Sequence, residues 1–334
     1  MIIADVVNIR NFKAGKMTDI SFVIPAFNEE KFLPRTIQSI QNHVGDRYSY
    51  EIIIVDHGST DRTVELARAS GAVVHERTEA KTISDLRNFG VSQAQAPILV
   101  FLDADTSLTA DWIRHFPDTY AAIQREPFVI TGSKREIPDS ASWVSRHWFK
   151  TDKTNVQPTH LGGGHIITTK LLFDKIGGFS PAMETGEDYE FCIRAKKSGA
   201  SLTAQPALRA LHYGVPGNLR QYFMREVWHG RGDWLSIDSF LSSKVAALSI
   251  IFLLLHVAFV GSLVLFTSYT LIWTTALLGI ISLCLMSAFY QYRKQTIRVI
   301  LANSVIYYAY YWARTVSLIS VLIRRTAKKH TRRV

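Results

Sequence analysis

Two carboxylates, Asp103 and Asp105, directly follow the apolar run Pro97–Leu102. The run predicts a buried strand, and a strand that ends there delivers both carboxylates to one edge of its sheet. Mg²⁺ and Mn²⁺ prefer oxygen ligands and keep coordination positions for water and substrate phosphates, so two carboxylates can suffice. The pair therefore indicates a site for a metal and a diphosphate. The alternative is that both residues only cap a helix expected from Thr109.

The hydrophobic pattern predicts the sheet that would position this pair. Four short β-rich runs alternate with stretches that carry apolar residues at helical spacing. The expected strands are 20–24, 51–55, 72–75 and 98–102, and the expected helices are 29–44, 60–70 and 82–94. This alternation predicts a parallel sheet with helices on both faces, in which ligands bind at the carboxyl ends of the strands.

Polar turns follow the first two expected strands, at 25–30 and 56–63. A carboxylate such as Asp56 can accept hydrogen bonds from a base or a ribose, and Arg87 offers a planar fork for phosphate oxygens. Asn28 and Asp61 could equally be helix caps, and Glu29 suits a helix N-terminus whatever its function. Polar groups after three strands favour a nucleotide site.

These motifs, in this order and spacing, resemble those of family 2 glycosyltransferases, which have the α/β, Rossmann-like GT-A fold for nucleotide sugars. The resemblance covers the first two thirds of the chain and rests on four segments: 25–29, 55–63, 87–90 and 103–105. His57 departs from the acidic or amide residue most often found there, which bears on nucleotide preference. The chain also lacks a G-x-G-x-x-G after the first strand, which argues against a dinucleotide oxidoreductase.

The resemblance implies roles for individual residues in the donor site. Arg87 would lie near the diphosphate, and Asp105 would bind the metal, Mg²⁺ or Mn²⁺. The residues implied in donor binding are Pro25, Ala26, Asn28, Glu29, Asp56, Arg87, Asn88, Asp103, Ala104 and Asp105.

A second acidic pair, Glu187 and Asp188, follows Gly177-Gly178-Phe179, as family members place it. Acids here could simply start the helix expected from 187 to 197. Inverting sugar transfer to a hydroxyl, however, needs a general base near the acceptor oxygen. We expect Asp188 to be that base and Glu187 to orient the acceptor or the base.

Other residues between 128 and 214 yield weaker expectations. His212 closes the expected last strand of the domain and is a candidate third metal ligand beside Asp103 and Asp105. Trp143 and Trp148 lie in a long polar and aromatic stretch, where they either line a lid or, as we favour, anchor the loop. Two scattered cysteines, Cys192 and Cys284, form no zinc or disulfide pattern, which fits a reducing compartment.

The C-terminal third predicts a membrane hairpin. Residues 245–266 and 270–290 carry no charge, and each run can cross a bilayer of about 30 Å. Buried helices of a soluble core are the alternative. We expect five parts: an extension (1–17), the GT-A domain (18–214), interfacial helices (215–243), a membrane region (244–323) and a basic cytoplasmic tail (324–334).

Positive charge follows the hairpin, at Arg293, Lys294 and Arg298. This asymmetry predicts that the catalytic domain and the tail lie on the cytoplasmic side of the membrane. We expect that membrane to be a bacterial inner membrane. A third apolar segment, 299–323, contains aromatic residues and Arg314, so we expect an interfacial or re-entrant helix more than a third crossing. Arg314 is a candidate ligand for a lipid phosphate. The net charge of +10 indicates anionic lipid as partner rather than nucleic acid.

The leading hypothesis is a membrane-anchored, metal-dependent inverting glycosyltransferase. It would move a sugar from a nucleotide donor to a hydroxyl of a lipid-linked acceptor at the cytoplasmic face. One alternative is transfer to a polyprenyl phosphate, whose anionic oxygen needs no base. Another is a non-catalytic nucleotide-sugar sensor or scaffold, which would bind donor without turnover.

Overall fold

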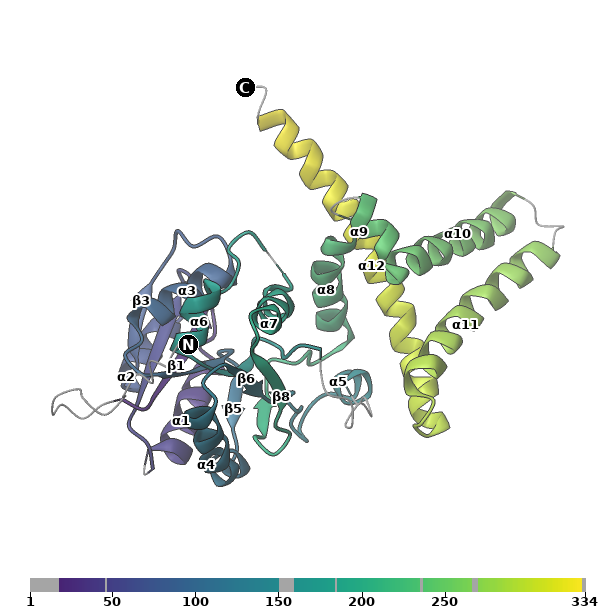
Figure 1. The fold of residues 1–334 in the computed structure, drawn as a ribbon. Helices are drawn as coiled ribbons and strands as arrows, with labels where there is room; N and C mark the ends of the chain where they lie inside the picture. The colour runs from purple at the N-terminus through teal and green to yellow at the C-terminus, as the bar shows by residue number, and fades with distance from the viewer. Residues whose placement is uncertain are drawn as a thin grey trace, which may run out of the picture. The chain divides into compact units, whose positions relative to one another are not determined.

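The computed structural model describes residues 18–45, 47–149, 159–183, 185–234, 237–265 and 270–331. By its internal contacts the chain divides into two compact units. The first comprises Met1–Glu136 and Gln157–Gly214, and the second comprises Ile137–Val156 and Val215–Val334. The first unit contains the sheets and the second is helical (Figure 1).

The main sheet of the first unit has seven strands within the described residues, in the order β3-β2-β1-β4-β7-β6-β8. Most neighbouring strands are parallel, but β7 is antiparallel to both β4 and β6, so the expectation of a wholly parallel sheet is wrong. Leu102 pairs with His165, so β7 starts where β4 ends. The strands are β1 (Ile20–Ala26), β2 (Tyr50–Asp56), β3 (Val73–Glu76), β4 (Ile98–Leu102), β6 (Val129–Gly132), β7 (His165–Thr169) and β8 (Ser201–Ala204).

A second, two-stranded sheet lies directly after the Asp103–Asp105 segment. Its strands are β5 (Thr106–Leu108), which the sequence pattern did not reveal, and β9 (Ala210–His212). They are antiparallel, and Thr106 pairs with His212. This pairing carries a residue more than 100 positions away along the chain to the end of β4.

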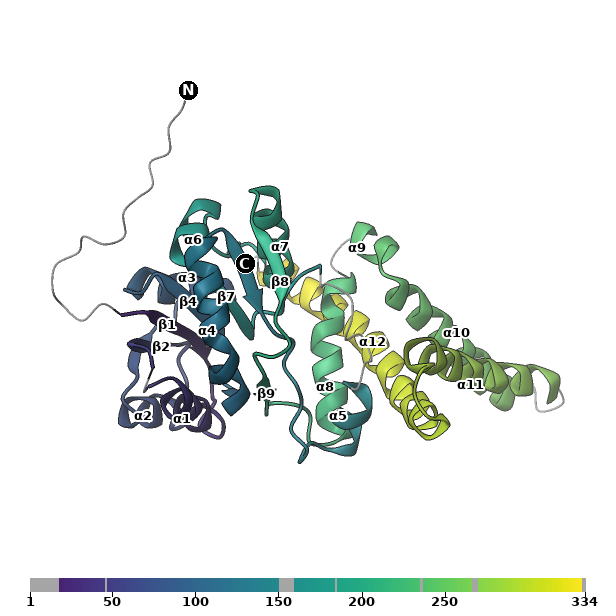
Figure 2. The same ribbon diagram turned by 60° about the horizontal axis from the view of Figure 1, so that its bottom comes forward.

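Helices cover both faces of the main sheet, as predicted (Figure 2). Successive residues of a strand point to opposite faces, so Phe22 packs in one core and Val23 in the other. The first core includes residues of α1 (Leu33–Val44), α2 (Thr63–Ala69) and α4 (Ala110–Arg125), and the second those of α3 (Ile83–Gln93), α6 (Lys170–Ile176) and α7 (Glu187–Lys197). Helix α7 has the bounds that the sequence predicted.

The second unit packs its helices around an aromatic core. Tyr222, Phe252, Ile306 and Tyr310 are among the buried members of this core. The helices are α5 (Trp143–Trp148), α8 (Leu219–Gly230), a 3₁₀ turn η1 (Arg231–Trp234), α9 (Ile237–Ser242), α10 (Lys244–Leu265), α11 (Thr270–Tyr292) and α12 (Ile297–Thr331).

The loop after β6 belongs to this helical unit through Trp148. The Trp148 ring lies 5.2 Å from the rings of Tyr222, Tyr307 and Tyr310. The backbone of α5 is held as well, since the Tyr292 hydroxyl donates to the Trp148 carbonyl at 2.5 Å. Trp148 therefore anchors the loop, whereas Trp143 is 44% exposed.

Arg314 is neutralised by protein carboxylates. Its guanidinium donates to Glu226 at 2.9 Å and to Asp233 at 3.2 Å, and its side chain is only 12% exposed. The structure thus contradicts the expectation that Arg314 offers a charge to a lipid phosphate. Helix α12 runs unbroken from Ile297 to Thr331, so this segment makes no re-entrant turn. Its position relative to a membrane stays a prediction.

Gly90 gives a direct test of how closely α3 packs on the sheet. A Cβ at this position would lie 2.5 Å from a methyl carbon of Val23 and 3.2 Å from one of Val55. Because both valines are buried in strands, we expect Gly90→Ala to lower the free energy of unfolding by about 1–3 kcal/mol despite the better helix propensity of alanine. Thermal unfolding of the full chain in detergent measures this.

Gly162→Ala is the matched control, because its added Cβ would meet nothing closer than 3.8 Å. We expect this variant to unfold at the wild-type temperature. Equal unfolding temperatures for Gly90→Ala and wild type would contradict the packing described for α3.

Candidate active site

The carboxyl ends of β1 and β2 are tied together by hydrogen bonds between their loops. The Asn28 backbone N–H donates to Ser59 Oγ, and Asn28 Oδ1 accepts from the Thr60 N–H, both at 2.8 Å. The Glu29 N–H donates to Thr63 Oγ1 at 2.7 Å. Asn28 has φ +55°, a left-handed conformation that asparagine tolerates. Asn28 therefore shapes the loop, and Pro25 and Ala26 lie inside strand β1.

Asp56 is fully buried and bonds to its own turn. One carboxylate oxygen accepts from the backbone N–H groups of Gly58 and Ser59, both at 2.8 Å, and the other accepts from Ser59 Oγ at 2.5 Å. The sequence assigned this carboxylate to a base or ribose. In the structure it builds the loop that bonds to Asn28, and its contact with a base or ribose stays a prediction.

Asn88 is also committed to the backbone. Its side-chain nitrogen donates to the Phe179 carbonyl at 2.8 Å, and its oxygen accepts from the Phe179 N–H at 2.9 Å. A Cβ on Gly178 would meet that oxygen at 2.7 Å. The predicted donor-binding residue is therefore a clamp on the Gly-Gly-Phe turn.

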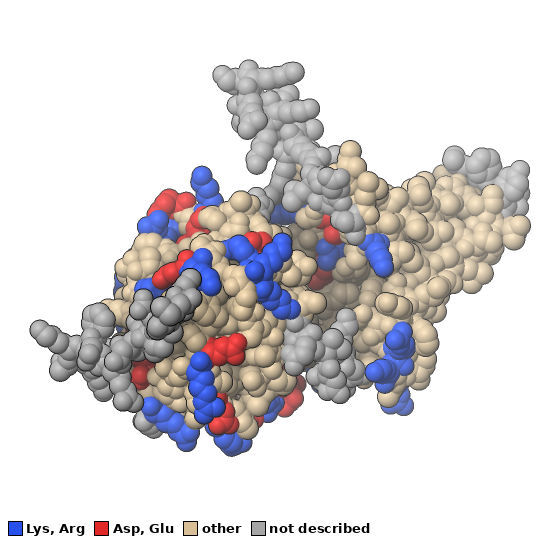
Figure 3. All heavy atoms as spheres, in the orientation of Figure 1, with Lys and Arg blue, Asp and Glu red and all other residues tan. Residues whose placement is uncertain are grey.

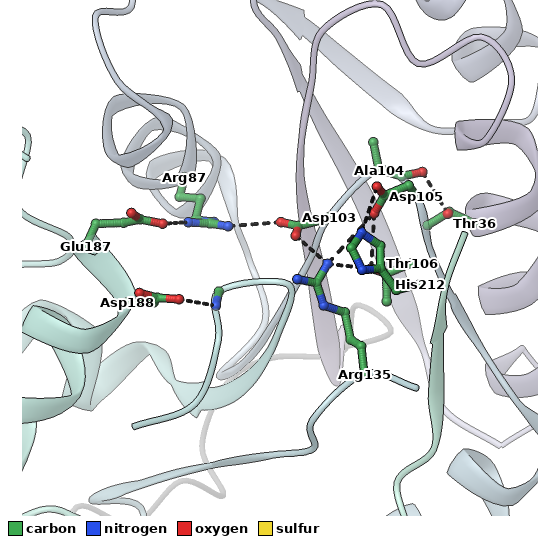
Figure 4. Close-up of polar contacts among 11 residues, drawn as sticks. Thr36, Arg87, Asp103, Ala104, Asp105, Thr106, Arg135, Glu187, Asp188 and His212 are labelled. Atoms are coloured by element: carbon green, nitrogen blue, oxygen red, sulfur yellow. Dashed lines mark hydrogen bonds and ion pairs between the residues drawn. The ribbon is translucent and has the colours of Figure 1, made fainter. Parts of the chain in front are cut away.

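Arg87 bridges the two acidic pairs. Its guanidinium donates to Asp103 Oδ1 at 3.0 Å and to Glu187 Oε1 at 2.7 Å (Figure 4). The Arg87 side chain is 2% exposed, so it does not present an open fork for phosphate oxygens as the sequence suggested. A buried guanidinium is stable only with such partners. Arg87 thus joins the end of β4 to the start of α7.

Arg135 is a residue of the site that the sequence reasoning missed. It follows β6, and its Nη1 lies 2.5 Å from Asp103 Oδ2 and 3.8 Å from Asp105 Oδ1. Burial alone would raise the pKa of Asp103, but Arg135 and Arg87 together hold it below its usual value. The signal was available, since Arg135 lies at the carboxyl end of a strand.

Two glycines make room for these arginines. A Cβ on Gly163 would lie 2.7 Å from an Arg87 nitrogen, and one on Gly164 would lie 2.2 Å from Arg135 Cζ. The packing of the two guanidiniums therefore requires glycine at 163 and 164.

Asp105 and His212 face each other at the end of β4. His212 Nε2 lies 3.1 Å from Asp105 Oδ2, because the β5–β9 pairing carries His212 there. Thr36 Oγ1 donates to the Ala104 carbonyl at 2.8 Å, so α1 fixes the segment between the two aspartates. As predicted, the structure brings Asp105 and His212 together.

A divalent cation fits the donor groups of Asp105 and His212. Both oxygens of Asp103 accept from arginines, and its part in binding a metal stays a prediction. The described residues contain no group of three or more His, Cys, Asp or Glu that could hold a metal ion. Burial raises the pKa of the Glu29 carboxyl to about 7, and the negative charges of Asp105, Asp103 and Asp61 add to the rise. A nearby cation would oppose the part of this rise that is due to charge.

The two acidic residues at the start of α7 have different hydrogen-bond partners. Glu187 is 8% exposed and bound by Arg87. Asp188 is half-buried and accepts from the Gly163 N–H at 2.9 Å and the Tyr189 N–H at 2.8 Å. Asp188 has no arginine partner among the bonds of the described residues, in contrast to Glu187.

His165 is a fully buried residue that contacts α4 and the segment after β6. Its Nε2 accepts from the Trp112 indole N–H at 3.0 Å, and its Nδ1 lies 2.9 Å from Ser133 Oγ and 3.2 Å from the Ser133 backbone nitrogen. Burial, together with the charge of Arg135, lowers the pKa of His165 to about 3. His165 is therefore a neutral structural residue that links α4 to the strand ends.

Acidic pairs thus follow β4 and start α7, and the chain from β1 almost to α7 matches the model of a known family. Residues 21–184 match the model of glycosyl transferase family 2. These residues form a family 2 glycosyltransferase domain.

Curated relatives of this glycosyltransferase are distant. The dolichyl N-acetyl-alpha-D-glucosaminyl phosphate 3-beta-D-2,3-diacetamido-2,3-dideoxy-beta-D-glucuronosyltransferase of Methanococcus voltae is 22% identical over 66% of this chain and 74% of its own. Glycosyltransferase AglE of Haloferax volcanii is 25% identical over 55% of this chain and 63% of its own. Mannosyltransferase PcManGT from Pyrobaculum calidifontis, solved with GDP-Man and Mn²⁺, is 15% identical, has a TM-score of 0.55 and matches over 90% and 87% of the two chains. That likeness shows the GT-A fold of the glycosyltransferase.

The raised pKa of Glu29 predicts a pH dependence of the glycosyltransferase domain. A carboxyl group whose folded-state pKa of about 7 exceeds its ordinary value of 4.5 binds its proton more tightly in the folded state. Its stabilisation is therefore complete below about pH 4.5 and is lost as the pH rises through about 7. We expect Glu29→Gln to abolish this loss.

The measurement compares unfolding temperatures of wild type and Glu29→Gln in EDTA from about pH 5 to about pH 8. The advantage of the variant should grow with pH. A difference that stays constant over this range would show that Glu29 is ionised throughout.

Proposed function

We propose that the chain is a membrane-anchored inverting glycosyltransferase that transfers a sugar from a nucleotide-sugar donor to a hydroxyl of a lipid-linked acceptor. The observation that carries this proposal is the unequal environment of the four carboxylates of the site. Asp103 and Glu187 are bound by buried Arg87, whereas Asp105 faces His212 and Asp188 has no arginine partner among the described bonds. Each acidic pair thus keeps one carboxylate for chemistry.

Asp188 is the proposed general base. The acceptor hydroxyl oxygen forms a bond to the anomeric carbon while the bond from that carbon to the donor diphosphate breaks, and Asp188 takes the hydroxyl proton. Its hydrogen bonds to the N–H groups of Gly163 and Tyr189 hold the carboxylate in place. Glu187 positions the start of α7 through Arg87.

Asp105 and His212 are the proposed metal ligands. A divalent cation bound there would neutralise charge on the departing nucleoside diphosphate. The loops at the ends of β1 and β2 are the proposed donor side, and Glu29 is their carboxyl group with a raised pKa. Asp56 contributes by fixing the shape of the loop after β2, and Asn88 by holding the turn at Phe179.

Membrane anchoring rests on α10 and α11. Lys244–Val264 and Thr270–Tyr292 are long and apolar enough to cross a bilayer. Only 17% and 22% of their most apolar windows are buried, which argues against helices in the core of a soluble protein. Leu254, Val264 and Met286 are each more than 60% exposed. The surface of α10 and α11 in Figure 3 has no charged side chains along most of its length.

The proposed orientation places the catalytic domain and the basic tail in the cytoplasm. Arg293, Lys294 and Arg298 follow α11, and positive charge marks cytoplasmic ends of membrane helices. Helices α8 and α9 would lie at the surface, where anionic lipid would attract the basic residues. The lipid-linked acceptor draws support from the Methanococcus voltae relative, whose name specifies a dolichyl sugar phosphate acceptor.

The test is a donor screen on the full chain in nanodiscs with Mn²⁺ or Mg²⁺, following release of nucleoside diphosphate with and without membrane lipid extract. We expect lipid-stimulated release with at least one donor. Asp188→Asn should lower turnover by about 100-fold or more, because general base catalysis contributes that much. Asp105→Ala should abolish the metal-dependent release of nucleoside diphosphate. Asp118→Asn, at an exposed position, is the matched control and should release it at the wild-type rate.

The other outcomes distinguish the alternatives. Turnover that survives Asp188→Asn would indicate an acceptor that is already anionic, such as a polyprenyl phosphate. Metal-dependent donor binding without release, for any donor and any lipid, would contradict the proposal and favour a sensor or scaffold.

A further inference from the structure

Arg135 lies where a cation that bridged Asp103 and Asp105 would have to lie. Its Nη1 is 2.5 Å from Asp103 Oδ2 and 3.8 Å from Asp105 Oδ1, as Figure 4 shows. The same nitrogen lies 3.2 Å from Thr106 Oγ1. One guanidinium nitrogen therefore lies within 4 Å of polar side chains at three of the four positions from Asp103 to Thr106.

This position is a built feature of the fold. The Arg135 side chain is 22% exposed, and Gly164 leaves the space that its guanidinium occupies. Asp103 is bound on its other oxygen by Arg87, so Asp103 has no free oxygen to offer a second cation. Asp105 retains Oδ2, which faces His212.

We propose that Arg135 is a resident cation of the site, which competes with the divalent metal for Asp105 and so weakens metal binding while no donor is present. The inference rests on the proposed metal-dependent function. A divalent ion at Asp105 would lie close to the positive charge of Arg135, and two cations repel in a partly buried site. The negative charges of a donor diphosphate would offset this repulsion, so metal and donor would bind together.

The experiment measures Mn²⁺ affinity of the full chain in detergent by electron paramagnetic resonance, without donor and with a nucleoside diphosphate. We expect Arg135→Gln to bind Mn²⁺ at least about tenfold more tightly than wild type in the absence of nucleotide. Arg135→Lys, which keeps the charge, should bind Mn²⁺ as weakly as wild type. Arg62→Gln, at an exposed ion pair with Glu65, controls for net charge.

Adding Asp105→Asn to Arg135→Gln should remove the gained affinity, which assigns the ion to Asp105. Unchanged or weaker Mn²⁺ binding by Arg135→Gln would overturn the inference, and binding by wild type with nucleotide would still uphold the metal in the proposed function. Absence of Mn²⁺ binding in every variant, even with nucleotide, would overturn both. A tenfold gain in Arg135→Lys would also overturn the inference, because charge would not be the cause.

Discussion

A buried guanidinium must be surrounded by acceptors, because the free energy of removing its charge from water is large. Arg87 meets this requirement with two carboxylates that lie 16 and 100 residues away along the chain. One belongs to the segment after β4, and the other starts α7. The main sheet and the acceptor side of the site are therefore held in register by one side chain. The close approach of Gly163 to Arg87 extends the same constraint to the turn before β7.

The balance of charge around Arg87 divides the site into structural and chemical groups. Asp103 and Glu187 are satisfied by arginines, so they are poor candidates for proton transfer or metal binding. Their sequence neighbours Asp105 and Asp188 lack such tight arginine contacts among the described residues. Each acidic pair thus combines one carboxylate bound by arginine with one that we propose to take part in the chemistry.

The local pattern of the sequence predicted the elements and the edge at which the site lies. Strand and helix periodicity located β1 to β4 and α7, and the acidic pairs indicated the family, which the match over 21–184 confirms. Side-chain partners could not be predicted in the same way. Asp56 and Asn88 have the residue types of ligands, but their bonds go to backbone groups whose positions depend on tertiary structure. Arg135 follows β6 at the carboxyl edge of the sheet, but its residue type alone did not distinguish it from the other basic residues of the loop.

Strand direction was the other limit of the sequence. Antiparallel β7 carries the same apolar signal as a parallel strand, and β5 has only three residues, so neither pattern reveals its pairing. These two strands matter for the site: β7 begins beside the end of β4, and β5 pairs with the strand that holds His212. The sequence therefore located the strand ends at which the site lies but not the strand pairings that assemble it.

A double-mutant cycle on Arg87 and Glu187 tests whether buried Arg87 holds the start of α7 to the segment after β4. The free energy of unfolding of the full chain is measured by pulse proteolysis in urea for wild type, Arg87→Met, Glu187→Gln and the double variant. We expect Arg87 and Glu187 to couple by about 2 kcal/mol or more, because each single variant leaves a buried group without its partner. The exposed pair Arg62 and Glu65, at 2.8 Å, is the control and should couple by less than about 1 kcal/mol. If the coupling between Arg87 and Glu187 is no larger than that of the control pair, Arg87 does not hold α7 to the sheet.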